Sequence, residues 1–405
     1  MARLGIRTRV IGVMTIVALA LPVALVAPAA AKPKGDPVKV MVIAELTEGI
    51  VNPELPEGAQ AAAEAFNKKN GIGGGPVEVI VCDTQNDPNV AAECGRSAVE
   101  EGVVAIIGAL TVHSSAFMDL MVENKIPSIG VVLAGVTDFQ SESSFPVSGG
   151  IIATSSDLPR FLYDDGARAI SVARPDLAAG AALKTFGDIA LEKVGSAMVN
   201  DVPVPIDAPD MSTYVEAALA NDSDAIIVAL PGQQALNFVQ AAKQANPDVK
   251  LALISTEQAA VVEALGEDVA GIIQAPTTLP PTIVKTKEGK RFLKEIKKAG
   301  FDESGGFRLN SWIAMQVLAT VAADLPEVTG PAVFDALNSV DSVETGLTPP
   351  LQWHTASDLG SLSALATRVF NACELALKFN KKGKVKPVTG KFFDALTGED
   401  CETPS

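Results

Sequence analysis

The residues best suited to covalent chemistry in this sequence are His113, Ser114 and Ser115, which are consecutive. A histidine beside a serine can act as the general base of a hydrolase, because an imidazole titrates near neutral pH. The second histidine, His354, is far away in the sequence, and no GxSxG motif surrounds the two serines. No third group that would orient His113 is evident from the sequence, so a secreted hydrolase is the unfavoured alternative.

Other patterns that often indicate chemistry have structural explanations here. Residues 71–75 (Gly-Ile-Gly-Gly-Gly) follow a predicted helix and precede a predicted strand. This order is the reverse of that in a dinucleotide-binding motif, so the glycines predict a turn. The sequence has no P-loop motif, and its paired acids, such as Glu100-Glu101 and Asp164-Asp165, stand where solvated acids are usual. We therefore expect no catalytic residue, no cofactor and no metal site.

Strands and helices alternate in two successive runs, and this order predicts the fold. In the first run, strands are predicted at 38–43, 77–81, 103–107 and 127–132, with helices at 58–70, 87–102 and 114–125. Asp87 is the predicted N-cap of the second helix, and Pro88 its first helical residue. In the second run, strands are predicted at 168–173, 197–202, 224–230, 249–254 and 269–274, with helices at 176–194, 212–221, 233–246 and 256–265. Continuous apolar strands that alternate with helices indicate parallel sheets covered on both faces. The fold class is therefore α/β, with two Rossmann-like lobes.

The last third of the chain does not extend the second run. Three consecutive helices are predicted at 288–300, 309–325 and 329–340, followed by β-rich stretches at 368–379 and 384–393. This order indicates that the chain crosses between the lobes more than once, which makes a hinge. We assign residues 32–153 and 281–341 to lobe 1, and residues 154–280 and 342–405 to lobe 2. Loops after the strands of both lobes are then expected to line one shared pocket.

Residues 1–31 have the three parts of a secretory signal peptide. Arg3, Arg7 and Arg9 are followed by an uncharged apolar run at 10–26 and by Ala29-Ala30-Ala31. The alternative is a membrane anchor, but Pro22 interrupts the run, which is shorter than the roughly 20 residues that span a bilayer. No cysteine near the cleavage point offers a lipid anchor. We expect an exported protein, periplasmic or extracellular, with a mature chain of 374 residues (405 less 31).

The charge of the mature chain restricts its partners. Removal of the three signal arginines leaves 29 Lys and Arg (32 less 3) against 48 Asp and Glu, a net charge of −19. A surface this acidic repels nucleic acid and anionic lipid, so neither is an expected partner. We expect a monomer that binds a small molecule.

The four cysteines, at positions 82, 94, 373 and 401, all lie in the mature chain, where export permits disulfides. They allow three pairings. Because Cys82 ends a predicted strand and Cys94 lies in the next predicted helix, we favour the local pair Cys82–Cys94, which leaves Cys373–Cys401 by exclusion. Reduced, buried thiols remain the alternative, and the absence of CxxC spacing argues against zinc.

A set of short motifs occurs in a fixed order along nearly the whole mature chain. The motifs are at 38–43 (Val-Lys-Val-Met-Val-Ile), 66–74 (Phe-Asn-Lys-Lys-Asn-Gly-Ile-Gly-Gly), 82–88 (Cys-Asp-Thr-Gln-Asn-Asp-Pro), 105–108, 125–129, 368–371 and 383–385. The set resembles the branched-chain amino-acid-binding (leucine-binding) family of periplasmic binding proteins, type I fold. The resemblance implies a substrate-binding protein of an ABC transporter, whose partner is a permease in the membrane.

The resemblance also implies where a ligand would bind. Family members hold the ligand carboxylate with hydroxyls and backbone amides in the loop that here contains Thr111, His113, Ser114 and Ser115. The two serines open a predicted helix, whose free N–H groups suit an anion, although Ser is equally a common N-cap. Glu257 matches the family acid that holds the ligand ammonium, although a glutamate in a helix first turn needs no ligand.

Two positions depart from the family pattern. Ala134, beside Gly135, replaces an expected hydroxyl, and Leu177 replaces an expected tyrosine. Arg174 lies near Leu177 and is either a partner for a second ligand acid or a solvated surface charge. We expect a small polar ligand, an amino acid or a related small carboxylate. The alternative functions are a ligand-binding sensor for a membrane receptor and the secreted hydrolase.

Overall fold

The computed structural model describes residues 1–2, 33–49, 51–133, 135–205, 207–254, 258–276, 278, 280–281, 286–301 and 306–404. The predicted signal peptide at 1–31 therefore lies almost wholly outside the described residues. Among the helices that are described, none combines the length and the apolar character that a membrane span requires.

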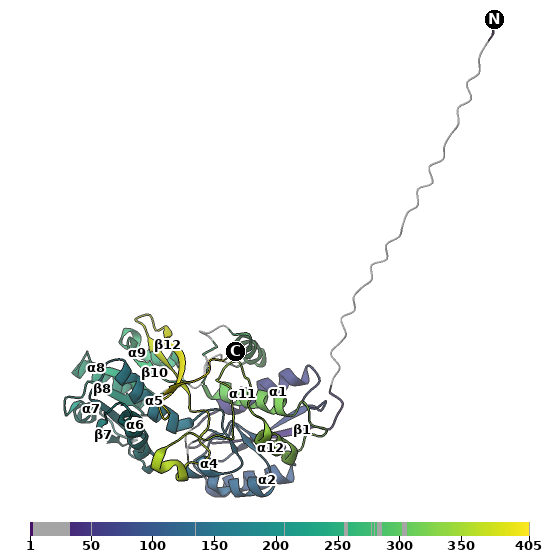
Figure 1. The fold of residues 1–405 in the computed structure, drawn as a ribbon, viewed down its shortest axis with the longest axis horizontal. Helices are drawn as coiled ribbons and strands as arrows, with labels where there is room; N and C mark the ends of the chain where they lie inside the picture. Colours follow the sequence, from purple (N-terminus) through teal and green to yellow (C-terminus); the bar gives the residue numbers. More distant parts are fainter. Residues whose placement is uncertain are drawn as a thin grey trace.

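The first lobe, in which Figure 1 labels β1, is built on a five-stranded parallel sheet of order β2-β1-β3-β4-β5. Its strands are β1 (Val38–Ala44), β2 (Val77–Asp83), β3 (Ala105–Ile107), β4 (Ser128–Ile129) and β5 (Ser144–Phe145). Every residue of β3 is buried, as is expected for a central strand covered on both faces.

The second lobe is built on an eight-stranded sheet of order β13-β12-β11-β10-β9-β8-β6-β7. The strands are β6 (Ile170–Pro175), β7 (Met198–Val204), β8 (Ala225–Val228), β9 (Lys250–Leu253), β10 (Ile273–Gln274), β11 (Glu374–Phe379), β12 (Val385–Asp394) and β13 (Glu399–Asp400). The five strands β6–β10 pair in parallel, as predicted, but β11, β12 and β13 add antiparallel pairs at one side. This sheet is mixed because the chain returns to it at its C-terminal end as a hairpin.

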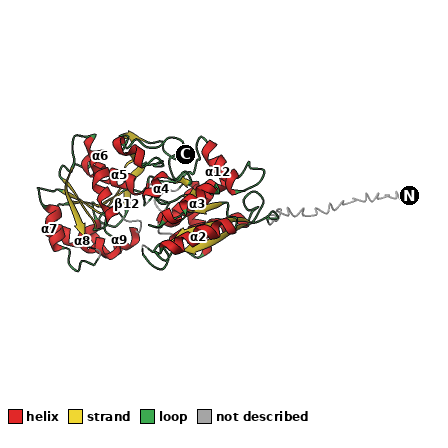
Figure 2. Ribbon diagram, turned by 90° about the horizontal axis from the view of Figure 1, so that it is seen from below, coloured by secondary structure: helices red, strands yellow, loops and turns green. Residues whose placement is uncertain are grey.

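Helices enclose both sheets, with α5 to α9 in one lobe and α2, α3 and α12 in the other (Figure 2). The α-helices are α1 (Glu54–Asn67), α2 (Pro88–Glu100), α3 (Met118–Glu123), α4 (Val136–Gln140), α5 (Gly150–Asp164), α6 (Ala182–Glu192), α7 (Ser212–Leu219), α8 (Gly232–Ala245), α9 (Gln258–Leu265), α10 (Lys287–Ala299), α11 (Gly306–Val321) and α12 (Gly330–Ser339). Short 3-10 helices lie at η1 (Ser114–Ala116), η2 (Ala178–Ala181), η3 (Gly266–Val269) and η4 (Gly360–Leu365).

Several predicted elements are shorter than expected, and the strand predicted at 127–132 is only the two-residue β4. The helix predicted at 114–125 is divided into η1 and α3 at Phe117, whose Cβ lies 2.5 Å from where a Cβ on Gly95 would stand. Close packing of Phe117 on α2 has therefore overridden the helical periodicity. The strand predicted at 368–379 begins only at Glu374, because the backbone N–H of Arg368 donates to the carbonyl of Phe139 (2.7 Å) and Asn371 has a positive φ of 56°, which is not a strand conformation. The strand predicted at 269–274 is reduced to β10 and is preceded by η3.

The chain passes between the two lobes three times. It leaves the first sheet after β5, leaves the second sheet after β10, and returns to the second sheet at β11. At the first crossing, the carbonyl of Pro146 accepts hydrogen bonds from Trp353 Nε1 (2.8 Å) and Asn371 Nδ2 (3.1 Å). At the second, Leu375 N donates to the carbonyl of Pro276 (2.9 Å). The crossings therefore lie side by side and form the predicted hinge.

After the second crossing, α10 and α11 pack on the first lobe against α1. A Cβ added to Gly58 of α1 would stand 2.0 Å from the carbonyl oxygen of Arg308, and one added to Gly108 would stand 2.2 Å from Ser311 Oγ. These glycines let α11 approach both α1 and the end of β3. The guanidinium of Arg308 also pairs with Glu57 of α1.

We expect Gly58→Ala to lower the free energy of unfolding by about 1–3 kcal/mol, because the added methyl group forces α1 and α11 apart. Chemical denaturation with the exposed Glu64→Ala in the same helix as control measures this effect. Equal stabilities for the two variants would contradict the close approach of the two helices.

Three acids are buried where the crossings enter the second lobe. Asp157 and Glu374 are fully buried, and Asp394 is 8% exposed. Thr154 donates to Glu374 (2.6 Å), and the backbone N–H of Ala395 donates to Asp157 (2.7 Å). Burial raises the pKa of all three carboxyls, and the nearby Glu374 and Asp394 raise the pKa of Asp157 further.

Because the folded pKa values of Asp157 and Glu374 lie above the unfolded values near 4, the folded state binds the extra protons. Their stabilising contribution is complete below about pH 4 and is lost as the pH rises through the folded values. We expect the melting temperature of the wild type to fall between pH 5 and 8 more steeply than that of Asp157→Asn/Glu374→Gln. The exposed Asp119→Asn is the control, and parallel profiles would show that both acids are ionised in the fold.

Candidate functional site

The loops after β1 and β3 are joined beyond the ends of these strands. Leu110 N donates to the carbonyl of Ile43 (3.1 Å), and Glu45 N donates to the carbonyl of Leu110 (3.3 Å). The parallel pairing therefore continues one step past the sheet. It places Glu45 beside Thr111 and Val112, at the carboxyl end of the first sheet, where open α/β sheets bind ligands.

Glu45 organises this loop and was not among the residues predicted from the sequence. Its side chain is 2% exposed, and its Oε1 accepts from Thr111 Oγ1 (3.2 Å) and Val112 N (3.1 Å). The Thr111 hydroxyl in turn accepts from His113 N (3.1 Å). An acid directly after a buried strand was the only sequence signal for this role. Two donors of the predicted anion-binding loop thus already serve an internal carboxylate.

The ring of His113 contacts Asn86 in the neighbouring loop and not a serine. Its Nε2 lies 3.0 Å from both the carbonyl oxygen and the Oδ1 of Asn86. Within the described part of the chain, no hydrogen bond joins its ring to Ser114 or Ser115. The nucleophile–base pair that a hydrolase requires is therefore not formed by these residues.

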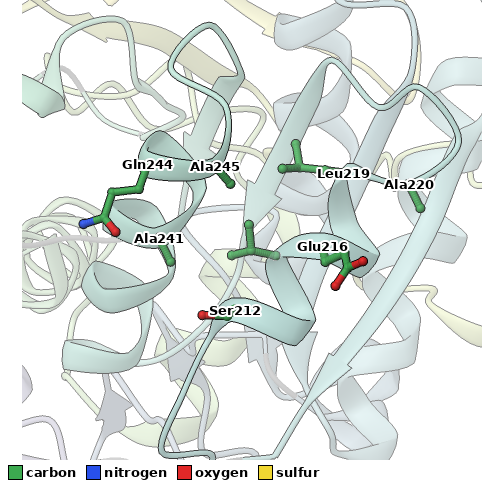
Figure 3. Close-up of a pocket in the computed structure, with 8 residues that line it drawn as sticks. Ser212, Glu216, Leu219, Ala220, Ala241, Gln244 and Ala245 are labelled. Carbon is green, nitrogen blue, oxygen red and sulfur yellow. The ribbon is translucent and has the colours of Figure 1, made fainter.

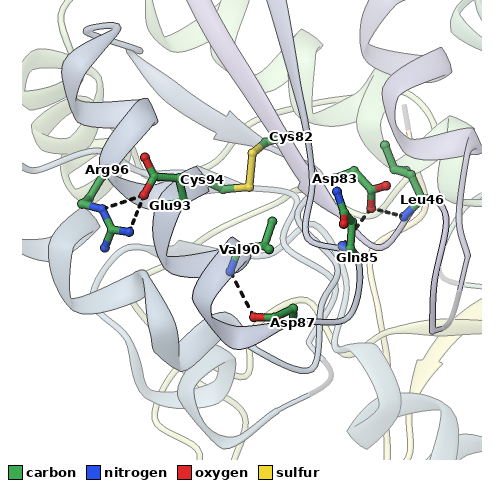
Figure 4. Close-up of a disulfide and its surroundings, with 9 residues drawn as sticks. All are labelled: Leu46, Cys82, Asp83, Gln85, Asp87, Val90, Glu93, Cys94 and Arg96. Carbon is green, nitrogen blue, oxygen red and sulfur yellow. Dashed lines mark hydrogen bonds and ion pairs between the residues drawn. A yellow bond between two sulfur atoms is a disulfide. The ribbon is translucent and has the colours of Figure 1, made fainter.

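The loop after β2 is held by a disulfide and by the carboxylates of Asp83 and Asp87 (Figure 4). The Cys82–Cys94 disulfide joins β2 to α2, and Cys373–Cys401 joins the start of β11 to the C-terminal segment, so both predicted pairings are confirmed. Asp87 caps α2 as predicted, with its Oδ1 accepting from Asn89 N (2.7 Å).

Asp83 connects the loop after β2 to the loop after β1. Its Oδ1 accepts from Leu46 N (2.9 Å) and from Gln85 N (3.0 Å), while Thr47 donates to its Oδ2. Partial burial opposes ionisation of Asp83, but the hydrogen bonds from these donors outweigh it and lower its pKa. The loops after β1, β2 and β3 thus form one connected rim on the first lobe.

The loop after β4 completes this rim. Ser114 is 5% exposed, and its Oγ lies 3.8 Å from where a Cβ on Gly135 would stand, so the structure brings these two predicted residues together. Gly135 N donates to Asp138 Oδ2 (2.9 Å) at the start of α4. Ser115 is exposed beside them. The predicted Ala134 lies outside the described residues.

In the second lobe, the loop after β6 presents Leu177, which is 49% exposed. Arg174 is only 8% exposed, and its Nη2 lies 2.9 Å from Asp201 Oδ2. The hydrogen bonds and charge of Asp201 raise the pKa of Arg174. The prediction of a solvated surface charge is therefore wrong, because the guanidinium is held by β7. Glu257 lies outside the described residues.

Exposed apolar side chains mark the strand ends of both lobes. Val112 (56% exposed) follows β3, Val136 (67%) follows β4, and Leu177 follows β6. The chain leaves the first sheet from the carboxyl end of β5 and the second from the carboxyl end of β10, so both of these sheet edges border the hinge. Exposed apolar groups near fixed polar groups are typical of a small-molecule site.

A groove of about 690 Å³ lies elsewhere, between α7 and α8 on the second lobe (Figure 3). Glu216 and Leu219 line it from α7, and Ala241 and Gln244 line it from α8. None of the residues predicted to bind a ligand lines this groove. We therefore base the candidate site on the strand ends.

Two Rossmann-like lobes, a hinge of three crossings and polar loops at the strand ends define a type I periplasmic binding protein. The chain belongs to the periplasmic binding protein family, whose sequence pattern matches residues 38–371.

Known relatives agree with this assignment. A possible leucine/isoleucine/valine-binding protein from Rhodopirellula baltica has a similar structure (TM-score 0.73, 14% identity, 89% of this chain and 98% of that chain). A leucine-binding protein from Thermotoga maritima is also similar (TM-score 0.65, 19% identity, 86% and 97%). The chemotactic signal transduction system substrate-binding protein BasB of Halobacterium salinarum is 28% identical over 186 residues, and the match spans 42% of this chain and 44% of BasB.

The Glu45–Thr111 contact can be tested by a double-mutant cycle. We expect Glu45→Ala and Thr111→Val each to cost about 1–3 kcal/mol in unfolding free energy, because each leaves a buried partner with an unsatisfied polar group. The double variant should cost less than the sum, since both changes remove one shared hydrogen bond. Strict additivity would show that the contact does not contribute.

Proposed function

We propose that this protein is the extracytoplasmic solute-binding component of an ABC importer, and that it closes its two lobes over a small polar ligand, an amino acid or a related small carboxylate. The observation that carries the proposal is the meeting of two sets of strand-end loops at one hinge. These loops present fixed polar groups from the first lobe and exposed apolar groups from both. Its partners are then the ligand and a membrane permease, and its place is outside the cytoplasm.

The ligand carboxylate is assigned to the first lobe. Because Glu45 already accepts from the Thr111 hydroxyl and the Val112 amide, the ligand must use Ser114 and Ser115, beside Gly135. η1 is too short to contribute an appreciable dipole, so the serine hydroxyls and local amides must provide the binding energy.

The remainder of the ligand is assigned to a mixed environment. Val112, Val136 and Leu177 favour an apolar part of the ligand, since their exposed surface would be removed from water on closure. Glu257 in the second lobe is the proposed acceptor for an ammonium group. An amino acid with an apolar side chain has the carboxylate, the ammonium group and the apolar part that these residues would bind.

We propose the lobe boundaries predicted from the sequence, with one refinement. α5 packs on β9, β10 and β11 of the second sheet, so the first crossing is best placed at residues 146–149 rather than at 153. The segment after α12 contributes Leu359, Val369 and Ala372 to the core around Met41 of β1, so this third crossing packs in part on the first lobe.

The test is thermal unfolding of the mature protein after refolding from denaturant, which removes any ligand carried through purification. Aliphatic and aromatic amino acids, amides, polyamines, short carboxylates and sugars are added singly. A ligand at 100 times its dissociation constant stabilises by about 2.7 kcal/mol, which raises the melting temperature by a few degrees. We expect an aliphatic amino acid to give this shift.

Variants then test the site. Ser114→Ala/Ser115→Ala and Glu257→Gln should each reduce the shift, whereas Ser339→Ala, at the end of α12, should leave it unchanged. A shift by sugars or polyamines alone would refute the amino-acid assignment. Turnover of an ester or amide that is lost in His113→Ala would refute the binding function in favour of the secreted hydrolase.

A sensor that presents its ligand to a membrane receptor is the second candidate. The observation that favours it is the similarity to BasB, whose name assigns it to a chemotactic signal transduction system. Both functions use the same site. Genes for a permease and ATPases beside this one would support import, and a neighbouring transducer gene would support sensing.

A further inference from the structure

One helix of the first lobe carries a concentrated positive charge. Five lysines, at positions 287, 290, 294, 297 and 298, are exposed along α10. At 100° per residue they fall within about one third of the circumference of the helix. Phe292 and Ile296 are buried on the opposite side, where α10 packs against α1. We call the five residues the lysine face of α10.

Interactions within the protein do not account for this face. Among the described residues, the one ion pair made by its lysines is Lys287–Glu288, at 3.9 Å, with the Lys287 side chain 94% exposed. The other acid of the helix, Glu295, accepts instead from Arg291 (3.0 Å) and from Trp312 Nε1 (2.8 Å). The lysine face is therefore not neutralised by its own helix.

The arrangement also works against the stability of the helix. Like charges spaced three and four residues apart, such as Lys290–Lys294 and Lys294–Lys298, each cost about 0.2–0.5 kcal/mol. The helix dipole favours Lys297 and Lys298 in the last turn, but it disfavours Lys287 in the first. Helix formation alone would not select this distribution of charge.

The rest of the molecule has the opposite charge. The whole chain has a formal net charge of −16, so the exposed strip of five lysines, four of which make no ion pair among the described residues, contrasts with the charge of the molecule. A second lysine group, at 381, 382, 384 and 386, lies at the turn between β11 and β12. That group has a local explanation, since lysines on an unpaired strand edge prevent pairing with other chains. β12 pairs with β13 only through Phe393 and Asp394.

We propose that the lysine face of α10 is a docking surface for an acidic patch on the membrane protein that receives the ligand, a partner class that rests on the function proposed above. Complementary charge of this kind steers a complex together and fixes its orientation. An anionic bilayer fits less well, because a planar negative surface would also repel the acidic remainder of the protein. The apolar side of α10 is, moreover, buried in the lobe and is not free to insert into lipid.

The experiment measures binding of the full mature chain to the membrane protein encoded beside its gene, reconstituted in uncharged phosphatidylcholine nanodiscs. The test variant carries Lys290→Glu, Lys294→Glu, Lys297→Glu and Lys298→Glu. The control variant carries the same change at Lys381, Lys382, Lys384 and Lys386, so both differ equally from wild type in net charge. We expect the α10 variant to associate at least about tenfold more slowly, with a weaker dependence on salt, and the control to remain within about twofold of wild type.

Two further measurements complete the test. Vesicles of phosphatidylcholine with 30% phosphatidylglycerol should not bind the wild type, and lysine-dependent binding to them would overturn the proposal in favour of a lipid surface. The proposal would also be overturned by any of three results with the nanodiscs. These are equal association of the wild type and the α10 variant, a larger loss of association in the control variant, and no binding by the wild type. The ligand-induced rise in melting temperature is recorded for every variant. If the rise is absent, the proposed binding function is wrong. If the rise is retained but the nanodiscs show none of the expected differences, only the docking proposal is wrong.

Discussion

The carbonyl oxygen of Pro146 holds together two of the three segments that join the lobes. Trp353 Nε1 and Asn371 Nδ2 both donate to it, although they lie 207 and 225 positions further along the chain. Asn371 also accepts from Gln352 N (3.1 Å) and adopts a positive φ of 56°, a conformation that asparagine tolerates better than most residues. Trp353 and Phe145 stack edge to face at 6.0 Å. Any motion of one lobe relative to the other must either keep these contacts or rotate the chain about them.

Buried acids continue this linkage into the second lobe. The first crossing leads into α5 and the third into β11, and the Thr154–Glu374 hydrogen bond joins these two elements directly. Asp157, also on α5, receives the backbone N–H of Ala395 from the far end of the chain. A protonated carboxyl can donate as well as accept, so a neutral pair here is better satisfied than two buried charges. The raised pKa values of Asp157 and Glu374, caused by burial, favour this neutral form.

On the first lobe, an internal carboxylate plays an organising part. Glu45 occupies the donors of Thr111 and Val112, and Asp83 occupies those of Leu46 and Gln85. Each acid ties one strand-end loop to another, so the rim is ordered before a ligand arrives. Preorganised polar groups lower the entropic cost of binding. Ser114 and Ser115 take no part in these four hydrogen bonds.

The α/β class, the two runs of strands and helices and the Asp87 cap could be predicted from the sequence, which also favoured the disulfide pairing that the structure confirms. These features depend on local periodicity, on capping chemistry and on short separations along the chain, which one sequence records directly. The resemblance to a known family added the expected ligand-binding loop that contains Thr111 and Ser114.

Which polar groups already have hydrogen-bond or ion-pair partners within the protein could be seen only in the tertiary structure. The sequence left Arg174 as either a partner of a ligand acid or a solvated charge, and the structure pairs it with Asp201 of the neighbouring strand. Glu45 had no apparent role until Leu110 was paired with Ile43. Likewise, Phe117 divides a predicted helix because it packs on Gly95, and the C-terminal hairpin makes the second sheet mixed. Such contacts join residues far apart in the chain, and their energies depend on burial and distance, which a linear pattern does not contain.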